Sequence, residues 1–320
     1  MRSFLALTGK SVFFAVLISA LVVSSFAQVS LRKAVDFDND GKADFSIFRP
    51  SNNQWYILGS GGGIRIQQFG VANTDFMAPG DYDGDGIADI AVWRETDGNW
   101  YKLNSATTTF SINTWGQPGD EPVARDYDGD GRTDTAVVRR SNGVMTWYLF
   151  LSANNGIVAR QFGVSTDFTA PGDYNGDGKF DFAVQRPGAT PTSPATFYIQ
   201  TAVSFDTVTF GQSSDLVVPG DWDGDGRTDI AVVREGATPT SNLTWLVRRS
   251  SDGGTTQVPW GVSGTDLNVQ NDYDGDGKTD FAVWRNTDGK FYIYNGVTGG
   301  ISIVSWGAPN DFPVASYDTH

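Results

Sequence analysis

The most informative segment of the sequence is residues 81–94, which read DYDGDGIADIAVWR. Its first nine residues follow the pattern D-x-[DN]-x-D-G-x-x-D. The same pattern occurs five more times, with copies spaced 45 to 51 residues apart, beginning at Asp36, Asp126, Asp173, Asp221 and Asp272. A repeat of this length is typical of propeller blades or similar arrays of one structural unit.

The segments around each copy repeat as well. An apolar run that ends in Arg follows directly, as in residues 90–94, and a third segment begins with an aromatic pair, as at Trp100. A fourth segment ends in an aromatic residue plus Gly, as at Trp115, and a short apolar run such as 76–78 precedes the next copy. These segments are rich in β-branched and aromatic residues and are separated by turn residues, so each unit predicts four short strands.

The sequence therefore predicts an all-β fold, a β-propeller of six four-stranded blades. A β-solenoid is disfavoured because its repeats are usually much shorter. Residues 306–315 copy residues 115–124 and then stop, so we expect this tail to pair with the first blade and close the ring. The segment from Val29 to Phe37 is a candidate for the inner strand of the first blade. Seven blades, one of them incomplete, is the alternative.

The nine-residue segments also predict metal sites. Like the front of an EF-hand, they place oxygen ligands at positions 1, 3 and 5, Gly at 6 and a backbone carbonyl at 7. Position 9 is Asp in every copy, and position 12 is apolar where an EF-hand has Glu, so the ligand set is complete within nine residues. Flexible, oxygen-only ligands favour Ca²⁺ over Mg²⁺.

We therefore predict about six Ca²⁺ sites, and an Asp- and Gly-rich turn without metal is the alternative. The predicted ligands, with position 7 acting through its backbone carbonyl, are Asp36, Asp38, Asp40, Lys42, Asp44, Asp81, Asp83, Asp85, Ile87, Asp89, Asp126, Asp128, Asp130, Arg132, Asp134, Asp173, Asn175, Asp177, Lys179, Asp181, Asp221, Asp223, Asp225, Arg227, Asp229, Asp272, Asp274, Asp276, Lys278 and Asp280.

These segments, together with the Phe-Gly and Trp-Gly pairs that end each unit, resemble the FG-GAP/VCBS repeat family, whose blades also form the integrin α-subunit propeller. The resemblance covers roughly residues 29–318. It implies a propeller with Ca²⁺ in the hairpin between the first and second strands of each blade. Members of the family serve in adhesion, in carbohydrate binding and occasionally beside or within lyases.

The amino-acid composition excludes several classes of partner and catalytic site. The net charge of −14 argues against nucleic acid as a partner, because phosphate binding needs a basic surface. The absence of Cys excludes disulfides, thiolate metal sites and cysteine nucleophiles. The one His is the last residue, His320, so a buried His–carboxylate pair cannot form. We expect a monomeric binding or adhesion module rather than an enzyme; a polysaccharide lyase or hydrolase and a purely structural surface module are the alternatives.

The amino terminus has the features of a signal peptide. Arg2 and Lys10 supply positive charge, and residues 12–23 form an apolar run that is shorter than the roughly 20 residues a membrane anchor needs. We expect cleavage before Gln28, which leaves one propeller domain over residues 28–320. The mature protein is then secreted or at the cell surface, without membrane insertion.

Three further features bear on binding. An Arg that ends each second strand and an Asp in each blade connection, such as Arg94 and Asp75, should lie on the face opposite the metal segments, where inter-blade ion pairs are the expected role. Trp100, Trp147 and Trp245 recur once per blade, which favours packing between blades.

The third feature breaks the repeat. Residues 188–193 and 236–241 are identical hexapeptides, GATPTS, which lengthen the same turn in adjacent blades. A neutral insertion at a loop tip is one interpretation. The functional one is a raised wall beside a groove that binds a glycan or a protein, with the candidate ligand-binding residues Thr190, Thr192, Tyr198, Thr238 and Thr240.

Overall fold

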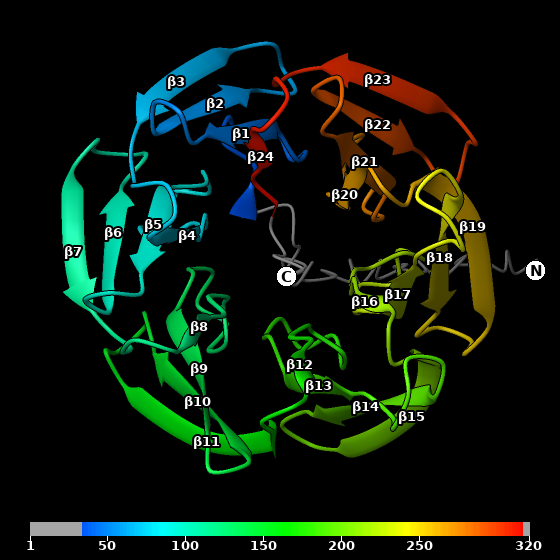
Figure 1. Cartoon of the computed structure of the whole chain (residues 1–320). Helices are drawn as coiled ribbons and strands as arrows, with labels where there is room; N and C mark the ends of the chain where they lie inside the picture. Colours follow the sequence, from blue (N-terminus) through cyan, green and yellow to red (C-terminus); the bar gives the residue numbers. More distant parts are fainter. Residues whose placement is uncertain (1–33, 316–320) are drawn as a thin grey trace, which may run out of the picture.

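A computed structural model describes residues 34–315. Over this range the chain forms six four-stranded antiparallel sheets, arranged as blades around a central axis (Figure 1). The predicted six-bladed, all-β propeller is confirmed. Within the described residues no helix has the length and apolar character needed to cross a membrane. The predicted signal segment, residues 1–27, and His320 lie outside the described range.

In five of the six sheets of the described range, the strands follow in chain order from the axis to the rim. Blade 2 contains β4 (Asp75–Met77), β5 (Ile90–Arg94), β6 (Asn99–Leu103) and β7 (Phe110–Thr114). Blade 3 contains β8 (Glu121–Pro122), β9 (Thr135–Ser141), β10 (Val144–Phe150) and β11 (Ile157–Val164).

Blades 4 to 6 repeat this order. Blade 4 contains β12 (Phe168–Thr169), β13 (Phe182–Arg186), β14 (Pro194–Gln200) and β15 (Phe205–Gln212). Blade 5 contains β16 (Leu216–Val217), β17 (Ile230–Arg234), β18 (Asn242–Arg248) and β19 (Thr255–Val262). Blade 6 contains β20 (Asp266–Asn268), β21 (Phe281–Arg285), β22 (Lys290–Tyr294) and β23 (Ile301–Ser305).

Blade 1 closes the ring with both ends of the described chain. It contains β1 (Phe45–Arg49), β2 (Gln54–Leu58) and β3 (Ile64–Gln68), and its innermost strand is β24 (Phe312–Pro313) (Figure 1). The tail thus pairs with the first blade as expected and forms no seventh blade. The expectation of an inner strand from Val29 to Phe37 is wrong for its described part, residues 34–37, because β24 occupies the position beside β1.

Burial along the strands follows their place in the blade. The second strands are covered on both faces, so β5 is buried at four consecutive positions from Ile90 to Trp93. The third strands alternate buried and half-buried residues, and the outer strands alternate exposed and half-buried ones. Trp100, Trp147 and Trp245 are fully buried, and each indole donates to a backbone carbonyl of its own blade. The interpretation of these Trp residues as core is confirmed.

The turn between the second and third strands is where the blades differ most. In blade 3 the turn is Asn142-Gly143, with φ of 53° and 80°, as a tight two-residue hairpin requires. In blades 4 and 5 the GATPTS hexapeptides lengthen this turn between β13 and β14 and between β17 and β18. These turns lie at the opposite end of the second strand from the Asp-rich segments.

The Arg and Asp residues on this face form ion pairs, as predicted. Each pair lies within one blade, so the prediction of pairs between blades is wrong. Asp75 in β4 lies directly across from Arg94 in β5, and its two oxygens accept from the guanidinium at 2.7 and 2.9 Å. The same carboxylate accepts from the backbone N–H of Val71, in the connection from blade 1, at 2.8 Å. The equivalent bidentate pairs are Arg49–Asp311, Arg139–Asp120, Arg186–Asp167, Arg234–Asp215 and Arg285–Asp266.

Candidate metal centres

Each Asp-rich segment forms a loop that leads into the second strand of its blade; in blades 2 to 6 it joins the first strand to the second, and in blade 1 it precedes β1. We number these loops by blade: loop 1 is residues 36–44, loop 2 is 81–89, loop 3 is 126–134, loop 4 is 173–181, loop 5 is 221–229 and loop 6 is 272–280. In loop 2 the first carboxylate, Asp81, accepts from the N–H groups of Gly84 at 2.6 Å and Gly86 at 2.9 Å. Asp85 accepts from the N–H of Ile87 at 2.8 Å. Local backbone bonds therefore orient the carboxylates before any ligand binds.

In loops 1, 2, 3 and 5 the ninth-position Asp joins the loop to the outer hairpin of its blade. Asp89 accepts from the N–H of Tyr82 inside the loop at 2.9 Å and from the N–H of Ser105 at 2.6 Å. Ser105 belongs to the turn between β6 and β7, so this carboxylate joins the loop to the outer hairpin. Asp44, Asp134 and Asp229 make the same pair of bonds.

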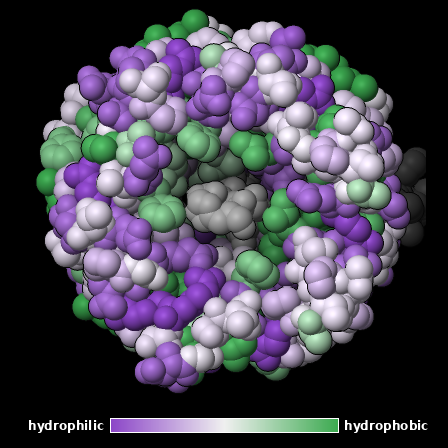
Figure 2. Space-filling view, viewed as in Figure 1, coloured by the Kyte–Doolittle hydropathy of each residue, from purple (hydrophilic) through white to green (hydrophobic). Residues whose placement is uncertain are grey.

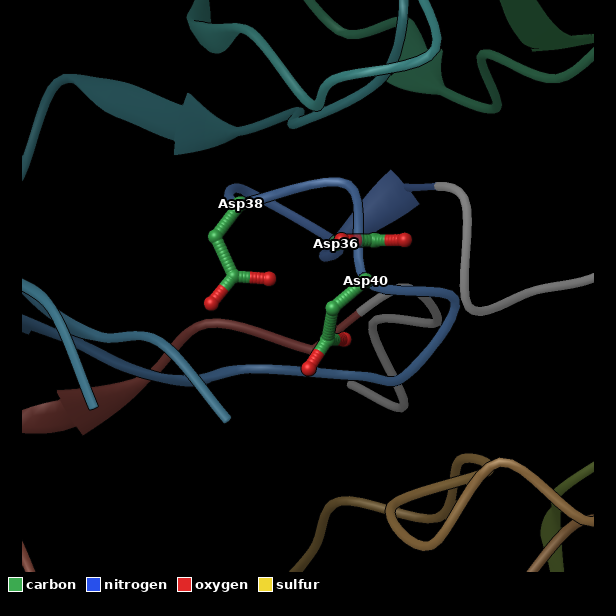
Figure 3. Close-up of side chains that lie close together, drawn as sticks. All are labelled: Asp36, Asp38 and Asp40. Atoms are coloured by element: carbon green, nitrogen blue, oxygen red, sulfur yellow. The ribbon is translucent and has the colours of Figure 1, made fainter. Parts of the chain in front are cut away.

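Carboxylates converge in five of the six loops of the described chain. In each of loops 1, 2, 5 and 6 the acids at positions 1, 3 and 5 offer oxygens that lie within 4.8 Å of one another. In loop 3 the trio is Asp126, Asp128 and Asp134. Figure 3 shows this convergence in loop 1, where Asp36, Asp38 and Asp40 gather on the inside of one turn of the chain.

The electrostatics of the loops favour a bound cation. Burial, opposed in part by backbone hydrogen bonds, raises the pKa of Asp89 and Asp134 to about 6. Burial also raises the pKa of four other ninth-position acids to about 7, namely Asp44, Asp181, Asp229 and Asp280. Neighbouring carboxylates of the same loop add to each shift. A divalent cation would offset both the loss of solvation and the mutual repulsion.

Two buried oxygens, one in loop 1 and one in loop 2, suit coordination to a hard cation. Oδ1 of Asp36, a residue that is 4% exposed, and Oδ2 of Asp83 are buried without a hydrogen-bond partner. A buried carboxylate oxygen without a partner is costly, and a coordinated cation would satisfy it. Ca²⁺ accepts six to eight oxygen ligands in flexible geometry, a number that the five positions of each loop reach when a carboxylate binds through both oxygens or water completes the set.

Loop 4 departs from the other five. Asn175 stands at position 3, where the other loops have Asp, so one charge is missing. Its amide donates to Asp177 at 3.1 Å. The turn residue of blade 4 is Thr201, whose hydroxyl accepts from the N–H of Ser204 at 2.8 Å within its own turn. Loop 4 therefore has one charge fewer than the other loops, and its turn hydroxyl bonds within the turn.

Sequence reasoning missed a set of Ser residues in the turns between the third and fourth strands. Ser105 donates to Asp85 at 3.0 Å, Ser152 to Asp130 at 2.9 Å and Ser250 to Asp225 at 2.8 Å, and Ser60 makes the corresponding contact to Asp40. Each hydroxyl therefore lies beside a fifth-position ligand. The only sequence signal was a Ser after the third strand at variable distance from the loop, which is too weak to identify the contact.

The predicted ligand-binding residues lie on the face of the Arg–Asp pairs. Thr190, Thr192, Thr238 and Thr240 are exposed on the two hexapeptide loops. Tyr198 is half-buried in β14, with the guanidinium of Arg186 over its ring at 4.4 Å from the centroid. The loops are braced by the blade connections, since Ser214 donates to the carbonyl of Pro191 at 3.0 Å and Gly264 to that of Pro239 at 2.8 Å.

Two cavities on this face were not anticipated. One of about 490 Å³ near the axis is lined by residues of blades 1, 2 and 6, including Phe76, Leu267, Phe312 and Glu95. One of about 270 Å³ between blades 5 and 6 includes Glu235. Figure 2 shows the hollow at the centre of the ring, with hydrophobic residues on parts of its rim. No local sequence pattern marks these cavities, because their walls come from different blades.

Comparison with known proteins agrees with this geometry. The family model for FG-GAP-like repeats matches three overlapping stretches, residues 36–92, 81–137 and 126–184. Each stretch runs from one metal loop to the second strand of the next blade. The chain is an FG-GAP repeat β-propeller. The remaining blades of the FG-GAP propeller have the same strand order and the same loops. No curated protein matches the sequence.

Solved structures resemble this FG-GAP propeller in fold. TolB from Acinetobacter baumannii is 15% identical with a TM-score of 0.53, and the match covers 84% of this chain but only 63% of TolB. A triple Arg-to-Ala mutant of AofleA from Arthrobotrys oligospora is 10% identical with a TM-score of 0.51, covering 89% of this chain and 90% of that one. At such identities the likeness is one of fold alone.

Proposed function

We propose that this FG-GAP propeller is an exported, calcium-binding module that recognises a glycan or a protein and is not an enzyme. The observation that carries the calcium assignment is the set of converging, backbone-oriented carboxylates with buried oxygens that lack partners in loops 1 and 2. When bound, Ca²⁺ would neutralise the acids and hold each hairpin together. The residues that would hold it are the acids at positions 1, 3, 5 and 9 and the carbonyl at position 7.

Equilibrium dialysis against Ca²⁺ after chelator treatment tests this assignment. We expect about six ions per chain, and fewer than three would contradict the proposal. The double variant Asp83→Asn/Asp85→Asn should lose one ion, because it removes two of the four ligand charges of loop 2. The matched control Asp206→Asn removes an exposed acid of β15 outside the loops and should lose none.

The proposal for a partner rests on asymmetry. The metal loops are nearly identical around the ring and offer little to distinguish one sector from another. The Arg–Asp face differs between blades, with an apolar cavity beside blades 1, 2 and 6 and two lengthened turns on blades 4 and 5. Specific recognition needs such a concave, uneven surface with a few polar groups.

A glycan array, probed with and without a chelator, tests this part. Binding that is lost when Ca²⁺ is removed and restored when it is added back would support a calcium-stabilised lectin-like module. Absence of glycan binding by the calcium-loaded protein would direct the search to protein partners. Turnover of a bound polysaccharide would contradict the non-enzymatic assignment.

A further inference from the structure

The six metal loops are joined to one another by backbone hydrogen bonds. In each junction the N–H at position 8 of one loop donates to the carbonyl at position 1 of the loop in the preceding blade. For example, Thr133 of loop 3 donates to Asp81 of loop 2 at 2.6 Å. The other junctions are Ala88 to Asp36, Phe180 to Asp126, Thr228 to Asp173, Thr279 to Asp221 and Ala43 to Asp272, all at 2.7 or 2.8 Å.

These bonds form a closed ring. The bond from Ala43 to Asp272 joins loop 1 to loop 6, the two loops that are farthest apart in the chain. Each bond also joins a predicted ligand residue of one site to the residue beside a predicted ligand of the next. The accepting residue supplies the first carboxylate of one loop, and the donating residue precedes the ninth-position carboxylate of the next. A change in the backbone conformation of one loop therefore alters a hydrogen bond to the next loop.

Side chains of neighbouring loops are also in contact. In five junctions the side chain at position 7 lies against the Gly at position 4 of the preceding loop. A Cβ added to Gly224 of loop 5 would lie 2.9 Å from Cγ of Lys278, and one added to Gly84 would lie 3.1 Å from Cγ of Arg132. Both glycines have positive φ, 78° and 83°, so backbone conformation and close approach both require Gly.

The sixth junction differs on both sides of the contact. Loop 1 has Asn39 at position 4, with φ of 59°, and loop 2 presents Ile87 where the other loops have Lys or Arg. The Gly and the long cationic side chain therefore occur together and are absent together in these loops. This agreement indicates that the contact between loops is a built feature and not a chance approach.

We propose that the loops bind Ca²⁺ as one coupled ring, in which each occupied loop positions the ligands of its neighbours. This inference rests on the proposed function. A cation that orders one loop also fixes two groups that the next loop contacts. The first is the backbone carbonyl at position 1, which accepts a hydrogen bond from the next loop. The second is the Gly at position 4, against which the position-7 side chain of the next loop lies. The neighbour then has less conformational entropy to lose when its own ion binds, so occupancy of adjacent loops is cooperative.

Terbium luminescence provides a site-resolved test. Loop 5 has Trp at position 2, Trp222, whereas the other loops have Phe or Tyr there. With excitation selective for Trp, the Tb³⁺ signal that disappears in the Trp222→Tyr variant reports on loop 5. Titrations with Tb³⁺ in the full chain then measure the affinity of this loop while other loops are altered.

Two matched variants separate coupling from general effects. Asp274→Ala/Asp276→Ala removes two ligands from loop 6, which adjoins loop 5, and Asp83→Ala/Asp85→Ala removes the same two from loop 2, which lies opposite. We expect the loop 6 variant to weaken Tb³⁺ binding at loop 5 by about fivefold or more, the lower end of typical coupling, and the loop 2 variant to change it less than twofold. Titration in 1 M salt, where the Debye length is about 3 Å, removes the effect of the lost charges.

Equal shifts in both variants, or no shift in either, would overturn the coupling. Circular dichroism of each variant with Ca²⁺ present checks that it folds. The wild-type Ca²⁺ titration is independent of any variant and should rise with a Hill coefficient above 1. A chain that binds several ions with a Hill coefficient of 1 contradicts the coupling alone, whereas a chain that binds none contradicts the proposed function.

Discussion

One bidentate ion pair helps to join the two ends of the ring, and its removal should cost more than that of an exposed surface pair. Asp311 precedes β24, and its carboxylate accepts from Arg49 of β1 at 2.8 Å through both oxygens and from the N–H of Ala308 at 2.7 Å. The Asp311 side chain is 3% exposed and that of Arg49 is 28% exposed. The guanidinium also lies 4.3 Å from the centroid of the Tyr56 ring.

The Asp311→Ala variant leaves the half-buried Arg49 guanidinium and the N–H of Ala308 without the carboxylate that accepts from both. Removing one partner of such hydrogen bonds costs about 1–3 kcal/mol, because the remaining donors lose their acceptor. The cost should be visible as a lower midpoint of urea unfolding at saturating Ca²⁺, followed by Trp fluorescence. Amide exchange of β24 and β1 should rise at the same time, since this pair holds the two ends of the ring together.

Two control variants test whether the loss of stability comes from the Arg49–Asp311 ion pair. The pair of Arg249 and Asp252 is exposed, so Asp252→Ala should leave the unfolding midpoint unchanged. Replacing both partners, as Arg49→Met/Asp311→Leu, should recover much of the lost stability, because apolar residues of similar size carry no desolvation penalty. A midpoint for Asp311→Ala that coincides with that of Asp252→Ala would refute the reasoning.

Four further outcomes are expected. Chelation should lower the melting temperature, because each occupied loop contributes about 1.4 kcal/mol at a tenfold excess of Ca²⁺ over Kd; an unchanged melting curve would count against metal binding. Loop 4 should bind most weakly, since Asn175 supplies no charge, and a site-resolved titration that ranks it tightest would contradict this. In chelator, stability should rise as the pH falls from about 7 to about 4, because folding raises the pKa of the ninth-position acids such as Asp44 to about 7, so the folded state binds more protons in this range; urea midpoints that fall over this range would oppose it. Deleting residues 188–193 and 236–241 should weaken ligand binding while Ca²⁺ content and melting temperature stay the same, and unaltered affinity would support a neutral insertion.

Much of this protein could be predicted from local sequence because its repeat is local. The spacing of the Asp-rich segments determines the number of blades, and the residues within each loop orient their own carboxylates, as in loop 2, where Gly84 and Gly86 donate to Asp81. The fully buried Trp100 was predictable for the same reason, since its place in the repeat requires one packing role in every blade.

Strand register could not be predicted from the local sequence. The sequence indicated that Arg94 and Asp75 pair but placed the pair between blades, whereas the register of β4 against β5 sets them opposite each other in one sheet. Register depends on how the two strands align after folding, and a one-residue shift would have turned the side chains to opposite faces. Closure was predicted only in part, because the sequence assigned the tail to the first blade but also offered residues 29–37 as its inner strand, and the structure places β24 beside β1.

The repeat, the strand types and the candidate ligands of each loop can be predicted from the sequence alone, because they depend on residues within one unit. The tertiary structure was needed to show which turn residues reach the loops and how the loops are joined to one another. Ser105 reaches Asp85, and Ala43 donates to the carbonyl of Asp272, through contacts between segments with no shared local pattern. Their positions follow from packing six blades around one axis, and that packing is a property of the whole ring and not of a single repeat.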